Sequence, residues 1–218
     1  MGVWGEIDGV VACWLIDGAH RLSALLATGN GDLLVPVMEA TVQGDARESD
    51  LFLKLNDRTL YQPIERFRNA VQARRFPEIN IYTILRHHGW HVANVATEGA
   101  LQCPEALISA YRLDDGKSLA EALDLLTETW GYARRSGEGH VIMGLALVCK
   151  RYGPKAFDRH ALGRKLAKYP GGAAGLVGAA RGLRSIRNNT SVAKCVAELV
   201  VDEYNKGRTS GRLPDWKA

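Results

Sequence analysis

The N-terminal part of the chain alternates apolar runs with glycine-containing breaks. Residues 10–16 form a short apolar run rich in β-branched and aromatic side chains, with an Asp-Gly pair on either side, which is typical of a buried strand. A helical pattern over 20–27 follows and stops at a Gly-Asn-Gly break, and a second strand is expected over 34–42. This order predicts a small α/β unit whose helix begins just beyond the second Asp-Gly pair.

Beyond about residue 46 the apolar residues recur with helical spacing. Leucines at 119, 123 and 126 and a tryptophan at 130 are spaced by four, three and four residues, so one face of that helix needs a packing partner. A short strand is expected over 90–95, and a polar tail, mobile at its end, over 207–218. Helices are also expected over 51–56, 63–71, 79–88, 138–152, 158–168, 173–187 and 190–206. The prediction is an α+β fold, with a small α/β N-terminal region followed by a mainly α-helical region.

This pattern divides the chain into three regions: an α/β region over 1–58, a helical extension over 59–135 and a basic helical C-terminal region over 136–218. The chain has 218 residues, 46% of them hydrophobic, which is enough apolar material for a core. It lacks both the run of about 20 apolar residues that spans a membrane and the pattern of a secretory signal. We therefore expect a cytoplasmic protein without a membrane partner.

Cysteines and histidines are arranged in a way that predicts no metal site. His87, His88 and His91 lie close together, but no acidic or cysteine partner is near them in sequence, and a helix C-terminus that favours cationic histidine is the simpler interpretation. The cysteines are far apart and form no Cys-x-x-Cys pair, so we expect buried free thiols in a reducing compartment. They are Cys13, Cys103, Cys149 and Cys195.

Charge is distributed unevenly along the chain. Residues 150–218 contain 15 Lys and Arg against 5 Asp and Glu, a net charge of +10, whereas residues 1–149 contain 13 against 19, a net charge of −6. A basic region of this kind is typical of a polyanion-binding protein, because each cation placed near a phosphate releases condensed counterions. A solvated helical surface is the alternative.

Three arginines in the basic region, Arg181, Arg184 and Arg187, recur every three residues, and Lys194 follows beyond an expected helix cap. The spacing places the arginines along one side of a helix, so it predicts either phosphate contacts to DNA or a solvated face. Two expected helices joined by a Pro-Gly-Gly turn precede these residues and could form a helix-turn-helix, although such turns also join other packed helices.

The turn between the expected strand and helix carries the most distinctive chemistry. It reads Asp17, Gly18, Ala19, His20, Arg21. Backbone N–H groups and the positive end of the helix dipole converge at such a position, which makes it an anion site. Arg21 adds a planar fork that grips phosphate oxygens in pairs, His20 adds a donor, and Asp17 is expected to order the turn or the guanidinium. An ordinary strand-to-helix turn with a surface ion pair is the alternative.

This turn also resembles a known family. The segment LIDGAHRLSAL at residues 15–25, followed by Val-Pro-Val at 35–37, resembles the core signature of ParB-like nuclease and DGQHR-type domains in the ParB/sulfiredoxin superfamily. The segment LFLKLNDR at 51–58 is similar to a Leu-Phe-x-x-Leu-Asn segment of ParB-like proteins common in actinobacteria and their phages. Less specific similarity continues at 84–89, 204–208 and 213–216.

The resemblance implies that Gly18, His20 and Arg21 bind nucleotide phosphates. We further expect a nucleoside triphosphate with Mg as the cofactor, DNA as a partner of the basic C-terminal helices, and a homodimer as the assembly. Sulfiredoxins have a catalytic cysteine where this chain has Ala19, so reductase chemistry is expected to be absent. Ala19 also leaves Asp17 as the only carboxylate of the turn, which argues against hydrolysis. The family has a longer segment before this strand, so we expect a shortened variant or a start upstream of Met1.

The leading hypothesis is therefore a nucleic-acid-associated protein that responds to nucleotide phosphate. One alternative is an enzyme, either a nuclease or a nucleotide hydrolase or phosphotransferase, that uses Asp17, His20 and Arg21. The other is a phage-type protein-interaction module in which the phosphate site is vestigial.

Overall fold

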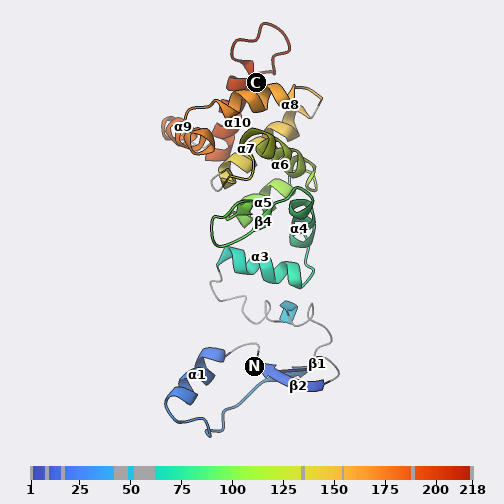
Figure 1. Cartoon of the computed structure of the whole chain (residues 1–218), viewed down its shortest axis with the longest axis vertical. Coiled ribbons are helices and arrows are strands. Elements are labelled where there is room, and N and C mark those ends of the chain that lie inside the picture. The colour runs from blue at the N-terminus through green and yellow to red at the C-terminus, as the bar shows by residue number, and fades with distance from the viewer. Residues whose placement is uncertain are drawn as a thin grey trace. The chain divides into compact units, whose positions relative to one another are not determined.

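A computed structural model describes residues 2–7, 10–15, 18–41, 49–51, 62–133, 136–153, 155–187 and 190–216. The described part is mainly helical and contains two small sheets, which is an α+β architecture (Figure 1). It forms two compact units, Met1–Phe76 and Pro77–Ala218, and each is described by itself. This division differs from the three regions over 1–58, 59–135 and 136–218, which remain an interpretation of the sequence.

The first unit contains a three-stranded sheet with the order β2-β1-β3. Strand β1, Gly2–Ile7, pairs antiparallel with β2, Val10–Leu15, and parallel with β3, Glu39–Thr41. Strand β2 confirms the run expected over 10–16. The prediction missed β1, and it was wrong for most of 34–42, because the described residues 33–38 are neither helical nor stranded.

Two helices complete the described part of the first unit. Helix α1, Ala19–Ala27, confirms the helix expected over 20–27, and each of its residues is described and none is buried. Helix α3, Pro63–Gln72, begins with a proline in its first turn, where the missing N–H costs nothing. It buries Phe67 and Ala70. Residues 49–51 are helical, but most of the helix expected over 51–56 lies outside the described residues.

The second unit is a helical assembly with one short two-stranded parallel sheet. The expected helices within it are confirmed to within two residues, and the expected strand over 90–95 is reduced to two residues. Strand β5 and helix α5 were not predicted. The elements are α4 (Glu78–His87), β4 (His91–Val92), β5 (Ala100–Leu101), α5 (Pro104–Tyr111), α6 (Lys117–Trp130), α7 (Gly139–Tyr152), α8 (Arg159–Ala167), α9 (Gly172–Ile186) and α10 (Val192–Asn205).

Helix α7 lies at the centre of this unit and packs against α5, α6 and α10 (Figure 1). The leucine face predicted for α6 is buried, with Leu119, Leu123 and Leu126 fully inaccessible. Gly144 of α7 allows α10 to approach closely, because a Cβ there would lie 2.5 Å from Cγ1 of Val196. The core thus depends on apolar burial and, at Gly144, on a residue small enough for α10 to pack closely.

The tail of the second unit is folded back as far as residue 216, and the last two residues, at the end that was expected to be mobile, lie outside the described residues. The side-chain amide of Asn205 accepts a hydrogen bond from Leu213 N at 2.8 Å and donates one to Leu213 O at 2.9 Å. Leu213 itself is buried, and Tyr152 donates its hydroxyl to Pro214 O at 2.7 Å. These bonds tie the tail to α10 and α7.

Two expectations from composition can be compared with the structure. Cys149 and Cys195 are buried and free, as expected, and burial raises the pKa of the Cys149 thiol to about 12. Cys13, however, is exposed on β2, so its predicted burial was wrong. Within the described residues, no helix has the length and apolar character needed to cross a membrane.

Candidate functional site

The predicted phosphate-binding turn lies at the start of α1. Gly18 precedes the helix with φ 98° and ψ 11°, in the left-handed region that favours glycine. Its carbonyl accepts the first helical hydrogen bond, from Leu22 N at 3.0 Å. The first turn of α1 is described in full and contains no acidic residue, so no carboxylate of that turn neutralises the positive end of the helix dipole.

Arg21 folds back over this end of the helix. A Cβ on Gly18 would lie 3.5 Å from Nη2 of Arg21 and 3.6 Å from its Nε, which places the guanidinium against the Gly18 backbone. Side chains of a helix tilt toward its N-terminus, so a residue three positions later reaches the cap. Ala19 and His20 are exposed beside it, whereas Asp17 lies outside the described residues.

The start of α1 carries two kinds of group that can bind anions. The first N–H groups of a helix have no partner within the helix, and the guanidinium of Arg21 lies beside Gly18, the residue before the helix. Ala19 contributes no acid or base, and the described part of the turn holds no carboxylate to activate water.

The basic residues predicted to contact DNA do not form one stripe. Arg181 and Arg184 are exposed on α9, and Lys194 is exposed near the start of α10. Arg187 follows the last helical residue, and its guanidinium is bound to the carboxylate of Glu198, which is only 6% exposed. That hydrogen bond raises the pKa of Arg187. The structure therefore places Arg187 in an ion pair with α10 of the same unit.

The exposed face of α9 includes two glycines. Gly178 and Gly182 lie on it, and a Cβ added to either would meet no heavy atom within 4 Å. Internal packing among the described residues therefore does not require these glycines. Arg181 lies between them in sequence and is exposed. An extended polyanion could approach the helix backbone here and meet two guanidinium groups, those of Arg181 and Arg184.

Helices α8 and α9, which the sequence offered as a possible helix-turn-helix, make their main contacts with other helices. Helix α8 packs on α6 and α10, and α9 packs on α10 and α7. In a helix-turn-helix the two helices are joined by a short turn and the second enters the major groove. Both helices pack on α10, as the two helices of a helix-turn-helix also pack on a third helix, so this interpretation stays a prediction from the sequence.

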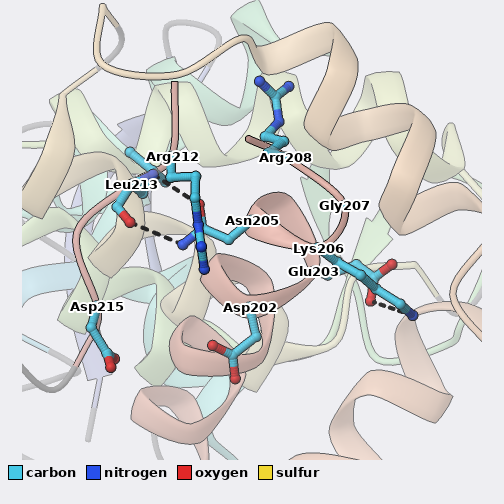
Figure 2. Close-up of a pocket in the computed structure, with 9 residues that line it drawn as sticks. All are labelled: Asp202, Glu203, Asn205, Lys206, Gly207, Arg208, Arg212, Leu213 and Asp215. Carbon is cyan, nitrogen blue, oxygen red and sulfur yellow. Dashed lines mark hydrogen bonds and ion pairs between the residues drawn. The ribbon is translucent and has the colours of Figure 1, made fainter. Parts of the chain in front are cut away.

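A cavity of about 700 Å³ lies between the end of α10 and the folded tail. Figure 2 shows Arg212 extending along it on the side of Asp202, whereas Arg208 points away. The Arg208 guanidinium lies 4.0 Å from the ring centroid of Tyr204, a cation–π contact. The lining mixes acidic and basic groups, and the side chains that shape it also anchor the tail, so its chemistry selects no class of ligand.

A second cavity, of about 550 Å³, lies where α4 ends beside α6. Most of the residues that line it have polar side chains: Arg86, His87, His88, Gly89, Asp124, Thr127, Glu128 and Tyr132. His88 Nδ1 lies 2.7 Å from Asp124 Oδ1. Sequence reasoning missed this partner because Asp124 is 36 residues away along the chain.

Arg159 of α8 holds the carboxylates of α6 in place. Its Nη2 lies 2.7 Å from Glu128 Oε1, and its Nη1 lies 3.3 Å from Glu121 Oε2 and 3.4 Å from Asp124 Oδ2. The hydrogen bonds to Glu128 raise the pKa of Arg159. Among the described residues, no group of three His, Cys, Asp or Glu side chains could hold a metal ion.

Comparisons with protein-family models, with curated proteins and with solved structures found no match to this chain.

Proposed function

We propose that this chain is a ParB-like, nucleic-acid-associated protein that responds to nucleotide phosphate. The observation that carries the proposal is the position of Arg21, whose guanidinium lies against Gly18 at the start of α1. A turn with the sequence Asp-Gly-x-His-Arg needs that arginine beside the helix N-terminus to bind phosphoryl oxygens. An arginine facing away from Gly18 would have removed the basis for the proposal.

Each residue of the turn has a distinct role in this proposal. Gly18 permits the left-handed backbone from which α1 begins. Arg21 supplies paired hydrogen bonds and charge, and exposed His20 supplies a further donor. The proposed ligand is the phosphate tail of a nucleoside triphosphate with Mg. Binding without hydrolysis is the proposed outcome, because Ala19 adds no general base.

DNA is the proposed second partner, through the second unit. The net charge of +10 over residues 150–218 and the exposed Arg181 and Arg184 support this part of the proposal. The glycines at 178 and 182 support it too, because they leave the α9 backbone accessible to a phosphate chain. Arg187 is removed from the proposed contacts, since its guanidinium is engaged with Glu198.

Nucleotide binding is tested by titrating the protein with CTP, ATP and ADP in the presence of Mg, with and without duplex DNA, by calorimetry. We expect saturable binding of at least one nucleotide, and an affinity that changes when DNA is present. Arg21→Gln should abolish binding, while Arg66→Gln, an exposed arginine on α3 of the same unit, should leave it unchanged. Equal binding by both variants would place the nucleotide elsewhere.

DNA binding is tested by measuring affinity for a duplex at several salt concentrations. Each lost phosphate contact lowers the slope of log K against log salt by about 0.9. Arg181→Gln with Arg184→Gln should therefore reduce the slope by about 2. Arg66→Gln is again the matched control for loss of positive charge. A slope that the double variant leaves unchanged would exclude α9 as the DNA surface.

A further inference from the structure

The cavity at the end of α4 is lined by ionisable side chains that have no role in the proposed function. Two neighbouring imidazoles, His87 and His88, line it together with Arg86. The two rings meet edge to face with centroids 5.3 Å apart. All three residues lie at the C-terminal end of α4, where the helix dipole favours cations. This site is in the second unit and is independent of the cradle at α1.

Asp124 fixes the orientation of His88. An ionised carboxylate only accepts hydrogen bonds, so the 2.7 Å contact requires a proton on Nδ1 of His88. The neutral ring then presents Nε2 as an acceptor, which is the form of a general base. Asp124 is itself held by Arg159, and the backbone carbonyl of His88 accepts a hydrogen bond from Tyr132 Oη at 2.9 Å. His88 is thus fixed by hydrogen bonds to both its imidazole ring and its backbone carbonyl.

An ion pair that ties α4 to α6 would explain His88 and Asp124 alone. The wall of the same cavity also carries a second imidazole and an arginine, and these two residues, His87 and Arg86, are exposed. A base oriented by a carboxylate, a second imidazole and a cation are the kinds of group that proton transfer at a phosphodiester uses. The cavity, at about 550 Å³, has room for a nucleotide.

We propose that this cavity cleaves single-stranded RNA by internal transphosphorylation. Arg86 binds the non-bridging oxygens of the phosphodiester. Nε2 of His88 takes the proton of the ribose 2′-hydroxyl, and O2′ attacks phosphorus. The bond from phosphorus to O5′ breaks, and protonated His87 gives its proton to O5′. The products are a 2′,3′-cyclic phosphate and a 5′-hydroxyl. The substrate supplies its own nucleophile, so the step needs no oxidant, reductant or further reactant.

The test uses the full chain with a single-stranded RNA oligonucleotide and the same oligonucleotide with 2′-deoxyribose throughout. We expect cleavage of the RNA alone, with cyclic-phosphate ends identified by mass spectrometry. His88→Asn and His87→Asn should each lower kcat by about 100-fold or more, the usual contribution of a proton-transfer group. His140→Asn, an exposed histidine on α7, should retain full activity. His87 is also exposed, so its variant is expected to fold.

Two further variants distinguish a catalytic effect from a loss of folding. Asp124→Asn, at the positioning residue, should lower kcat with KM unchanged, whereas Arg86→Gln should chiefly raise KM. Circular dichroism confirms that each variant is folded before it is assayed. Wild-type activity no greater than that of the double His87→Asn, His88→Asn variant would overturn the proposal, as would cleavage of the deoxy oligonucleotide. Neither result depends on Arg21, so failure here leaves the nucleotide proposal unaffected.

Discussion

The two units of the chain differ most in how their apolar side chains are used. In the second unit they are packed between helices, and α6, α7 and α10 each bury a run of fully inaccessible residues. In the first unit most described large apolar side chains are exposed. These are Trp4, Val11, Leu15, Leu22, Leu26, Leu33, Leu34, Val35, Val37, Met38 and Phe76.

The difference teaches that the two candidate sites depend on different forces. The dyad of His88 and Asp124 is placed by helices whose positions are fixed through burial, so packing determines its geometry. The cradle at α1 is placed by local backbone geometry, through the left-handed Gly18 and the return of Arg21 onto the cap. Substitutions in the distant core should therefore disturb the dyad of His88 and Asp124. They should leave the cradle at α1 intact.

The largest expected contrast is between leucines of the two units. Leu123→Ala should lower the free energy of unfolding by about 2 to 5 kcal/mol, because Leu123 is fully buried and its removal leaves a cavity. Leu26→Ala should change it by less than about 0.5 kcal/mol, since Leu26 is 60% exposed. Urea denaturation followed by circular dichroism measures both. A comparable loss in both variants would show that α1 is packed as tightly as α6.

A second contrast is between two helical glycines of the second unit. Gly144→Ala should destabilise the protein by about 1 to 3 kcal/mol, because the new methyl group would collide with Val196 and the Ala193 carbonyl. Gly182→Ala should instead stabilise it by about 0.5 to 1 kcal/mol, because its Cβ meets open space and alanine favours helix. Thermal unfolding distinguishes the two. A loss of stability in both variants would mean that another surface covers α9 at Gly182.

A third and smaller contrast is between two neighbouring arginines. Arg187→Gln should lower the midpoint of urea denaturation, because it leaves the buried carboxylate of Glu198 without this cation. Water offsets part of the loss, since the Arg187 side chain is 31% exposed. Arg184→Gln removes an exposed charge from α9 and should leave the midpoint unchanged. Identical urea midpoints for the two variants would show that the ion pair of Arg187 does not stabilise the fold.

The helices of the second unit were predictable because their signals are local. Leu119, Leu123 and Leu126 mark the buried face of α6, and glycine follows the last residue of α6 and of α7. Strands β4 and β5 were harder, since two-residue strands are set by pairing rather than by a local pattern. Helix α5 was missed although Pro104 at its first turn was a usable signal.

Side-chain partners were the least predictable part of the candidate sites. The spacing of Arg181, Arg184 and Arg187 correctly placed the first two on α9, but not the end of the helix before Arg187 or its contact with Glu198 of α10. The partner of His88 lies on another helix, so only the packing of α4 against its neighbours brings Asp124 to it. Proximity in sequence cannot reveal such pairs, because they form through tertiary packing.

The most direct test of the central claim is the response of the backbone amides of Gly18, Ala19, His20 and Arg21 to a nucleoside triphosphate, measured by two-dimensional NMR with Mg present. The account predicts that these amide resonances shift and saturate together as nucleotide is added, and that Arg21→Gln abolishes the shifts while Arg66→Gln preserves them. If these amides stay unperturbed while the nucleotide binds elsewhere or not at all, the turn at the start of α1 is not a phosphate cradle.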